Sequence, residues 1–129
     1  LSDGNVTLTN ATHSGRVLLV PDGGQDNTYT LPAPIAGSMF RFVYAGGAAD
    51  ATDAIIITPG NTNFYIGGIT FLDTDGNAIS SVFSNGSSNS SIQFNVPAGF
   101  DVTIMGLNTT NYQIFGNATS TTAPAFADQ

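Results

Sequence analysis

The stretch SIQFNV, residues 91–96, decides the fold class of this chain. Its apolar residues Ile92, Phe94 and Val96 alternate with polar ones, so they face one side of an extended strand. The stretch MFRFVY, residues 39–44, places Arg41 between Phe40 and Phe42, so polar and aromatic residues alternate there. Both patterns predict β-strands rather than helix.

Similar short runs continue on both sides of residues 91–96, separated by Gly, Asn, Asp, Ser and Pro at spacings of about 8 to 12 residues. The sequence predicts an all-β domain, an antiparallel β-sandwich or jelly-roll-like barrel with little or no helix and loose termini. The best helix candidate, residues 46–53, is short and rich in Ala and Gly. Strands are expected at residues 5–9, 15–20, 27–31, 38–45, 54–58, 65–72, 78–84, 90–96, 101–107 and 112–116. The expected core contains Phe40 or Phe42, Phe71, Phe94, Ile104 and Phe115.

A change in composition near residue 116 indicates the domain organisation. Residues 1–116 are expected to form the single sandwich domain, and residues 117–129 an extended C-terminal arm of small and polar side chains. Phe126 is the one large apolar residue of that arm, so it is a candidate anchor that docks on another surface.

The charge balance excludes several classes of partner. The 129 residues contain nine Asp, no Glu, no Lys and two Arg, for a net charge of −7, and no Cys. Such a chain lacks the basic patch that nucleic-acid binding requires and the cationic face of a membrane-surface helix. The absence of Cys excludes disulfides and thiol chemistry. We therefore expect neither a nucleic-acid nor a membrane partner, and no cofactor.

The residue types that common catalytic groups require are missing or incomplete, so no enzyme is predicted. His13 is the single histidine and lies in a turn before a strand, without a nucleophile elbow elsewhere. Asp73 and Asp75 could act as a paired acid and base, but turn chemistry favours an Asp-rich hairpin. Calcium at Asp73 and Asp75, or at Asp50 and Asp53, stays open as a weak alternative, although a full calcium loop would end in Glu.

The two arginines lie within apolar strands, at Arg16 and Arg41. In a chain of net charge −7, each is expected to pair with an Asp, either within the subunit or across an interface. Arg16, Arg41 and Phe126 are therefore the interface candidates.

Several short motifs, taken in order, resemble small β-rich virion proteins of tailed bacteriophages, among them head decoration (cement) proteins. They are TLT at 7–9, SGRV at 14–17, NTYTLP at 27–32, Gly37 with FRF at 40–42, and YQIFG at 112–116. The resemblance implies a structural protein on the outer capsid surface of the virion. It also implies the major capsid protein as partner and a homo-oligomer, with a trimer favoured.

Two other functions are weighed against this one. The first is a carbohydrate- or receptor-binding β-module of a phage fibre or secreted protein, with a cleft lined by Tyr29, Tyr44, Tyr65 or Tyr112. Finding these tyrosines packed inside would count against that module. The second, a small secreted glycan-active enzyme, is disfavoured by the missing acid and base residues.

Overall fold

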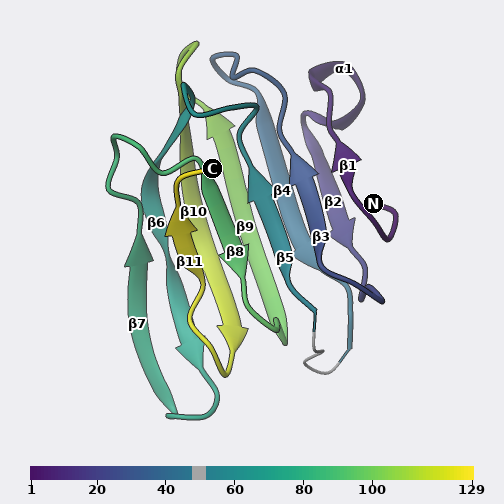
Figure 1. Cartoon of the computed structure of the whole chain (residues 1–129), viewed down its shortest axis with the longest axis vertical. Helices are drawn as coiled ribbons and strands as arrows, with labels where there is room; N and C mark the ends of the chain where they lie inside the picture. The colour runs from purple at the N-terminus through teal and green to yellow at the C-terminus, as the bar shows by residue number, and fades with distance from the viewer. Residues whose placement is uncertain (48–51) are drawn as a thin grey trace.

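A computed structural model describes residues 1–47 and 52–129, and in them eleven strands and one short helix form two packed β-sheets (Figure 1). The all-β sandwich is confirmed. The elements are β1 (Val6–Thr7), α1 (Asn10–His13), β2 (Arg16–Val20), β3 (Asn27–Thr30), β4 (Met39–Tyr44), β5 (Ala54–Ile57), β6 (Phe64–Asp73), β7 (Ala78–Phe83), β8 (Ser91–Phe94), β9 (Gly99–Gly106), β10 (Asn111–Ser120) and β11 (Ala125–Ala127).

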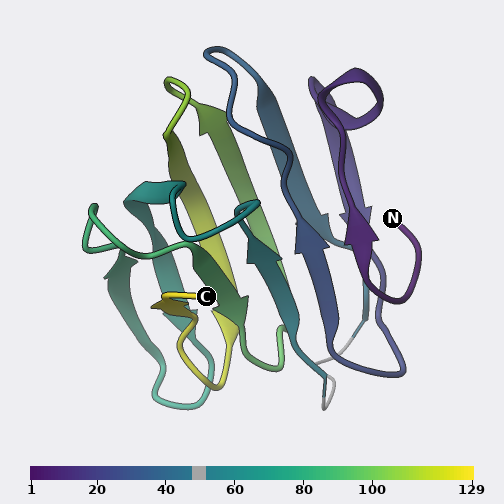
Figure 2. The ribbon, with the colours of Figure 1, turned by 45° about the horizontal axis from the view of Figure 1, so that its top comes forward.

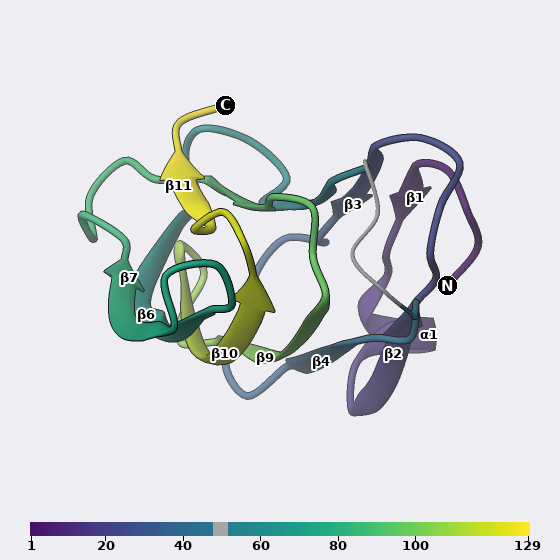
Figure 3. The ribbon, with the colours of Figure 1, turned by 90° about the horizontal axis from the view of Figure 1, so that it is seen from below.

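The chain crosses from one sheet to the other at each connection between β1 and β6. One sheet has the order β1-β3-β5-β8-β11, and the other the order β2-β4-β9-β10-β6-β7. An end view shows β1, β3 and β11 in one layer and β2, β4, β9 and β10 in the other (Figure 3). The antiparallel hairpins β6–β7 and β9–β10 then stay within the six-stranded sheet.

This crossing changes the expected strand direction. Four pairings among the described strands are parallel: β1 with β3, β3 with β5, β2 with β4, and β6 with β10. A chain that crosses the sandwich and returns re-enters its first sheet in the original direction, which makes neighbours parallel. The sheets are therefore mixed, whereas an antiparallel sandwich was expected, and the jelly-roll arrangement is not confirmed.

The core lies between the two sheets and follows the period of two. Phe40 and Phe42 both point inward from β4, and Ile104 of β9, Phe94 of β8 and Phe71 of β6 are buried as expected.

Phe115 does not belong to the core, which corrects a prediction. Tyr112 and Ile114 occupy the inward positions of β10 and are fully buried, so the next odd position must face outward. Phe115 accordingly leaves 48% of its surface exposed.

All ten predicted strands are present, with ends that shift by a few residues. The four-residue α1 was not anticipated, and Thr9 caps its start by accepting a hydrogen bond from the backbone N–H of Thr12. The helix candidate 46–53 falls largely on residues 48–51, which lie outside the described residues, and residues 46, 47, 52 and 53 are not helical.

The expected C-terminal arm is part of the sandwich. β10 continues through residue 116 to Ser120, because Ala118 and Ser120 keep the inward alternation. β11 then pairs antiparallel with β8. The Phe126 ring packs on Tyr65 with ring centroids 6.0 Å apart, so Phe126 docks within its own chain.

Both termini are attached rather than loose. The N-terminal ammonium of Leu1 donates to the carbonyl of Leu19 at 2.7 Å. At the other end, Gln129 Nε2 donates to the carbonyl oxygens of Thr58 (2.8 Å) and Ser90 (3.0 Å). Figure 2 shows the N-terminus beside β1 and β2, and β7 and β11 at the opposite side of the sandwich.

Candidate functional site

His13 is held as a structural residue at the end of α1. Its Nδ1 accepts a hydrogen bond from the backbone N–H of Thr9 at 3.0 Å, which helps to close the short helix. One nitrogen of its imidazole is therefore engaged locally, and His13 ends a four-residue helix where a turn was expected.

The Asp73 carboxylate shapes the β6–β7 turn. Its Oδ1 accepts hydrogen bonds from the backbone N–H groups of Asp75 (2.9 Å) and Gly76 (3.0 Å). This is an Asx turn, in which the side chain replaces a backbone acceptor. The geometry agrees with the hairpin interpretation of Asp73 and Asp75.

The second weak calcium candidate, Asp50 with Asp53, lies only partly within the described residues. Asp50 lies outside the described residues. Asp53 accepts from the backbone N–H of Val96 (2.8 Å) and from Gln93 Nε2 (2.6 Å), so its two oxygens link β5 to the end of β8. Across the described ranges, no three His, Cys, Asp or Glu side chains gather to hold a metal ion.

Three of the four tyrosines are packed inside, and the hydroxyl of Tyr65 links the two sheets. Tyr65 of β6 donates to the carbonyl of Ile56 in the opposite sheet at 3.1 Å, and Tyr112 donates to the carbonyl of Pro32 at 2.8 Å. Burial raises the pKa of both phenols above the ordinary value. With Tyr29 also buried, these rings cannot line an open sugar-binding cleft.

Arg41 forms its ion pair within the subunit. Its Nε donates to Asp101 Oδ1 at 2.9 Å and its Nη2 to Asp101 Oδ2 at 2.6 Å, a two-pronged contact between β4 and β9. Hydrogen bonding to the Arg41 guanidinium lowers the pKa of Asp101. Arg16 lies exposed at the start of β2, and no carboxylate of the described residues pairs with it.

The largest unexplained feature is the outward side of the six-stranded sheet, here called the six-strand face. It comprises the outward-pointing side chains of β2, β4, β9, β10, β6 and β7. Large apolar side chains are exposed on it at Val17, Leu19, Met39, Ile79, Phe83 and Phe115. Strands of a sandwich usually place polar residues outward, so a gathering of this kind marks an interaction surface.

The strand registers arrange these side chains in rows across the face. One row runs from Val17 through Arg41 and Thr103 to Phe115. A neighbouring row joins Met39, Met105 and Gln113. Apolar side chains therefore recur across the whole width of the sheet instead of standing singly.

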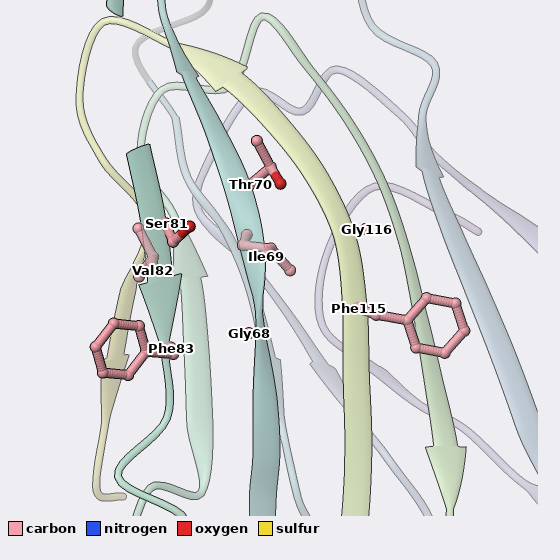
Figure 4. Close-up of a pocket in the computed structure, with 8 residues that line it drawn as sticks. All are labelled: Gly68, Ile69, Thr70, Ser81, Val82, Phe83, Phe115 and Gly116. Atoms are coloured by element: carbon pink, nitrogen blue, oxygen red, sulfur yellow. The ribbon is translucent and has the colours of Figure 1, made fainter. Parts of the chain in front are cut away.

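Two shallow hollows lie on either side of Phe115. The first, of about 430 Å³, extends from Phe115 to Phe83 of β7 (Figure 4). The rings of Phe115 and Phe83 point away from each other there, leaving Gly68 and Gly116 between them. The second hollow, of about 490 Å³, lies on the other side of Phe115 and is lined by Arg41 and Asp101.

Glycine is required where these hollows meet. Gly116 has a φ of +139°, and a Cβ there would collide with the backbone of Asp101 and Val102. Gly67 in the neighbouring strand has a φ of +94°. The β6–β10 pairing is interrupted at this level, between the Gly67–Ile114 and Thr70–Asn117 partners.

The six-strand face is electrically neutral although the chain is strongly acidic. Of the charged side chains on its described strands, only Arg41 and Asp101 point outward, and they neutralise each other. The net charge of −7 therefore resides elsewhere on the molecule.

No family model, curated protein or solved structure matches the chain. Within the described part of the chain, no helix has the length and apolarity needed to cross a lipid bilayer. The geometry of the six-strand face is therefore the evidence for the candidate site.

Sequence reasoning missed most of this surface. The strands carrying Val17, Leu19, Ile79 and Phe83 were expected, but no alternation assigned their faces. One signal was present: the run Val17–Val20 is apolar at every position, which places apolar side chains on both sides of a strand.

Proposed function

We propose that this chain is a non-catalytic structural protein of the virion, a decoration protein that binds the outer surface of a tailed-phage head. Its partner in this proposal is the major capsid protein, whose contacts it stabilises. The six-strand face is the surface that docks.

The observation that carries the proposal is the combination of apolar exposure and neutrality on this face. Phe115 stands near its middle with 48% of its surface exposed, flanked by two hollows that a partner's side chains can fill. Protein interfaces characteristically have an aromatic anchor and few charged residues at their centre. The resemblance of the N-terminal motifs to head decoration proteins supplies the identity of the partner.

A phage head presents an array of identical sites, and a flat, shallow docking surface such as the six-strand face suits such an array. Each contact can be weak, because the homo-oligomer that the resemblance implies would gain avidity from neighbouring sites on the lattice. The acidic remainder of the chain would stay in solvent and keep the particles apart.

The test is co-sedimentation of the purified chain with heads of its phage prepared without it. We expect the chain to pellet with the heads up to a fixed saturating ratio. Phe115→Asp and Leu19→Asp should each weaken this binding at least about tenfold, because they bury an unpaired charge at the contact.

Ile57→Asp provides the matched control, since Ile57 lies on β5 in the five-stranded sheet and the change adds the same charge. This variant should bind like the wild type. The proposal is contradicted if the wild type stays in the supernatant, or if all three variants bind equally well.

One observation supports a carbohydrate- or receptor-binding module as the second candidate. The hollow beside Arg41 combines an aromatic ring, Phe115, with polar groups of Asp101 and Asn117. Sugars are often bound by such a mixture of ring and hydrogen-bonding groups. Retention on a glycan array that is lost in Asp101→Asn, without binding to heads, would favour this function.

A further inference from the structure

The edge strand β7 is the longest unprotected strand edge of the described sandwich. It pairs only with β6, and five of its six residues are exposed. Ile79 and Phe83 leave 75% and 73% of their surfaces exposed. Strand edges of this kind are ready to pair with another chain unless charge, proline or a bulge blocks them.

The other edges are shorter or covered. β1 and β11 have two and three residues. The open edge of β2 receives the ammonium of Leu1, which donates to the carbonyl of Leu19. β7 contains no charged residue and no proline. Its exposed edge is therefore available as a pairing surface.

The hydrogen bonds of β7 fix which of its backbone groups face this edge. Ser84 N–H donates to the carbonyl of Gly67 at 2.9 Å, in the same register that pairs Phe83 with Gly68. In an antiparallel ladder, backbone groups alternate in direction along the strand. The N–H and C=O groups of Ile79, Ser81 and Phe83 therefore point away from β6.

We infer that β7 pairs antiparallel with β7 of a second copy, about a two-fold axis at Ser81. On each β7, the odd-numbered residues carry the backbone groups that point away from β6, and their side chains point outward. Because these groups must face each other to form hydrogen bonds, odd-numbered residues of one copy must lie opposite odd-numbered residues of the other. Centring on Ser81 places Ile79 of each copy opposite Phe83 of the other. The pairing would close three hydrogen-bonded residue pairs and join both six-stranded sheets.

The charges of the chain are compatible with this two-fold contact. Asp73 and Asp75 lie before β7, so in this register they extend past Ser84 of the second copy and are not brought together. Aromatic residues opposite β-branched ones stabilise antiparallel pairs, as Phe83 opposite Ile79 would. The inference stands apart from capsid binding, since it concerns the isolated protein.

The first experiment measures the mass of the full chain in solution by sedimentation velocity across the micromolar range. We expect a species of twice the 13.3 kDa chain mass. Its share of the protein should rise with concentration. Ser81→Pro should weaken this dimer at least about tenfold, because it removes an N–H that faces the open edge. Leu19→Asp, on the opposite edge of the same sheet, is the control and should dimerise like the wild type.

A cysteine trap tests the register without relying on a disruptive variant. The chain has no Cys, so Ser81→Cys introduces a single thiol on the axis. Opposed residues in a hydrogen-bonded pair lie about 5.5 Å apart between Cα atoms, within disulfide range. Mild oxidation should link this variant into dimers, while Thr70→Cys on neighbouring β6 should remain largely unlinked.

The double variant Ile79→Cys with Phe83→Cys should also link, whereas neither single variant should. A monomer at all concentrations, a trimer, or equal linking of Ser81→Cys and Thr70→Cys would overturn the inference. Loss of the dimer in Leu19→Asp but not in Ser81→Pro would overturn it as well. Dimerisation without binding to heads would instead contradict only the proposed function.

Discussion

At the scale of single residues, Gly116 allows β10 to approach β9 closely at the centre of the six-strand face. Its φ of +139° lies in a region that residues with a side chain avoid, and the backbone of Asp101 occupies the space a Cβ would need. Without a side chain, Gly116 lets β10 lie against β9 at this level, beside the hollow that extends from Phe115 to Phe83.

Gly116→Ala should therefore lower the free energy of unfolding by about 1 to 3 kcal/mol, measured by urea denaturation. Gly60→Ala is the matched control, because Gly60 has no atom within 4 Å of a built Cβ and no positive φ. The control should change stability by less than about 1 kcal/mol. Equal effects at both positions would show that Gly116 is under no strain.

The Arg41–Asp101 pair should contribute little to stability and should depend on pH. Both side chains are exposed, so Asp101→Asn should cost less than about 1 kcal/mol at neutral pH. The lowered pKa of Asp101 means that its contribution is complete above the unfolded value of about 3.9 and is lost as pH falls through the folded pKa.

The measurement is the difference in free energy of unfolding between the wild type and Asp101→Asn, followed from neutral pH to about pH 2. This difference should stay constant above about pH 5 and shrink below about pH 4. A difference that grows on acidification would contradict the assignment of the ion pair.

The sequence predicted which residues are buried better than it predicted which are exposed. Phe40, Phe94 and Ile104 are buried as expected, because alternation beside polar residues fixes their face. Phe115 was misplaced, since Ile114 and Phe115 are adjacent apolar residues and either could point inward. Only the position of Tyr112 two residues earlier settles which one does.

At the scale of elements, the C-terminal strand is the main departure from the sequence expectation. Residues 125–127 are small apart from Phe126, and three residues carry no readable period. Their strand forms because β8 offers an edge and because the Phe126 ring finds Tyr65. A strand that forms through contacts with residues distant in the chain leaves no local signal in the sequence.

Phe126→Ala should lower the free energy of unfolding of the isolated chain by about 2 kcal/mol, somewhat less than a fully buried phenylalanine would lose. Ala125→Ser, at the exposed preceding position, is the control and should be near neutral. Urea denaturation measures both. If Phe126 instead served as an arm for another protein, removing its ring would leave the isolated chain unchanged.

The positions of the strands were predictable, but their directions were not. A period of two is the same in parallel and antiparallel strands, so it cannot reveal that β6 and β10 run side by side in parallel. The short connections between sheets decide this, and their turn residues are compatible with either path.

At the scale of the whole molecule, an acidic body surrounds a neutral face and a neutral edge. Two copies that each carry a charge of −7 repel one another at a distance. Close approach through the uncharged β7 keeps the contact itself free of like charges, but the long-range repulsion remains.

Added salt should therefore strengthen the dimer, because it shortens the distance over which the two acidic bodies repel. Sedimentation velocity at low and high NaCl checks this, with Ser81→Pro expected to stay monomeric in both. A dimer that weakens as salt is added would indicate that attraction between charges holds it together.

The proposed function requires that the six-strand face, and not the five-stranded sheet, is the side that binds a phage head. A density map of the decorated head, detailed enough to separate strands, measures this directly. We predict that the six-strand face, with Phe115 at its centre, lies against the major capsid protein while the five-stranded sheet faces solvent. A map in which the six-strand face is turned to solvent, or in which the chain is missing from the head, would contradict the account.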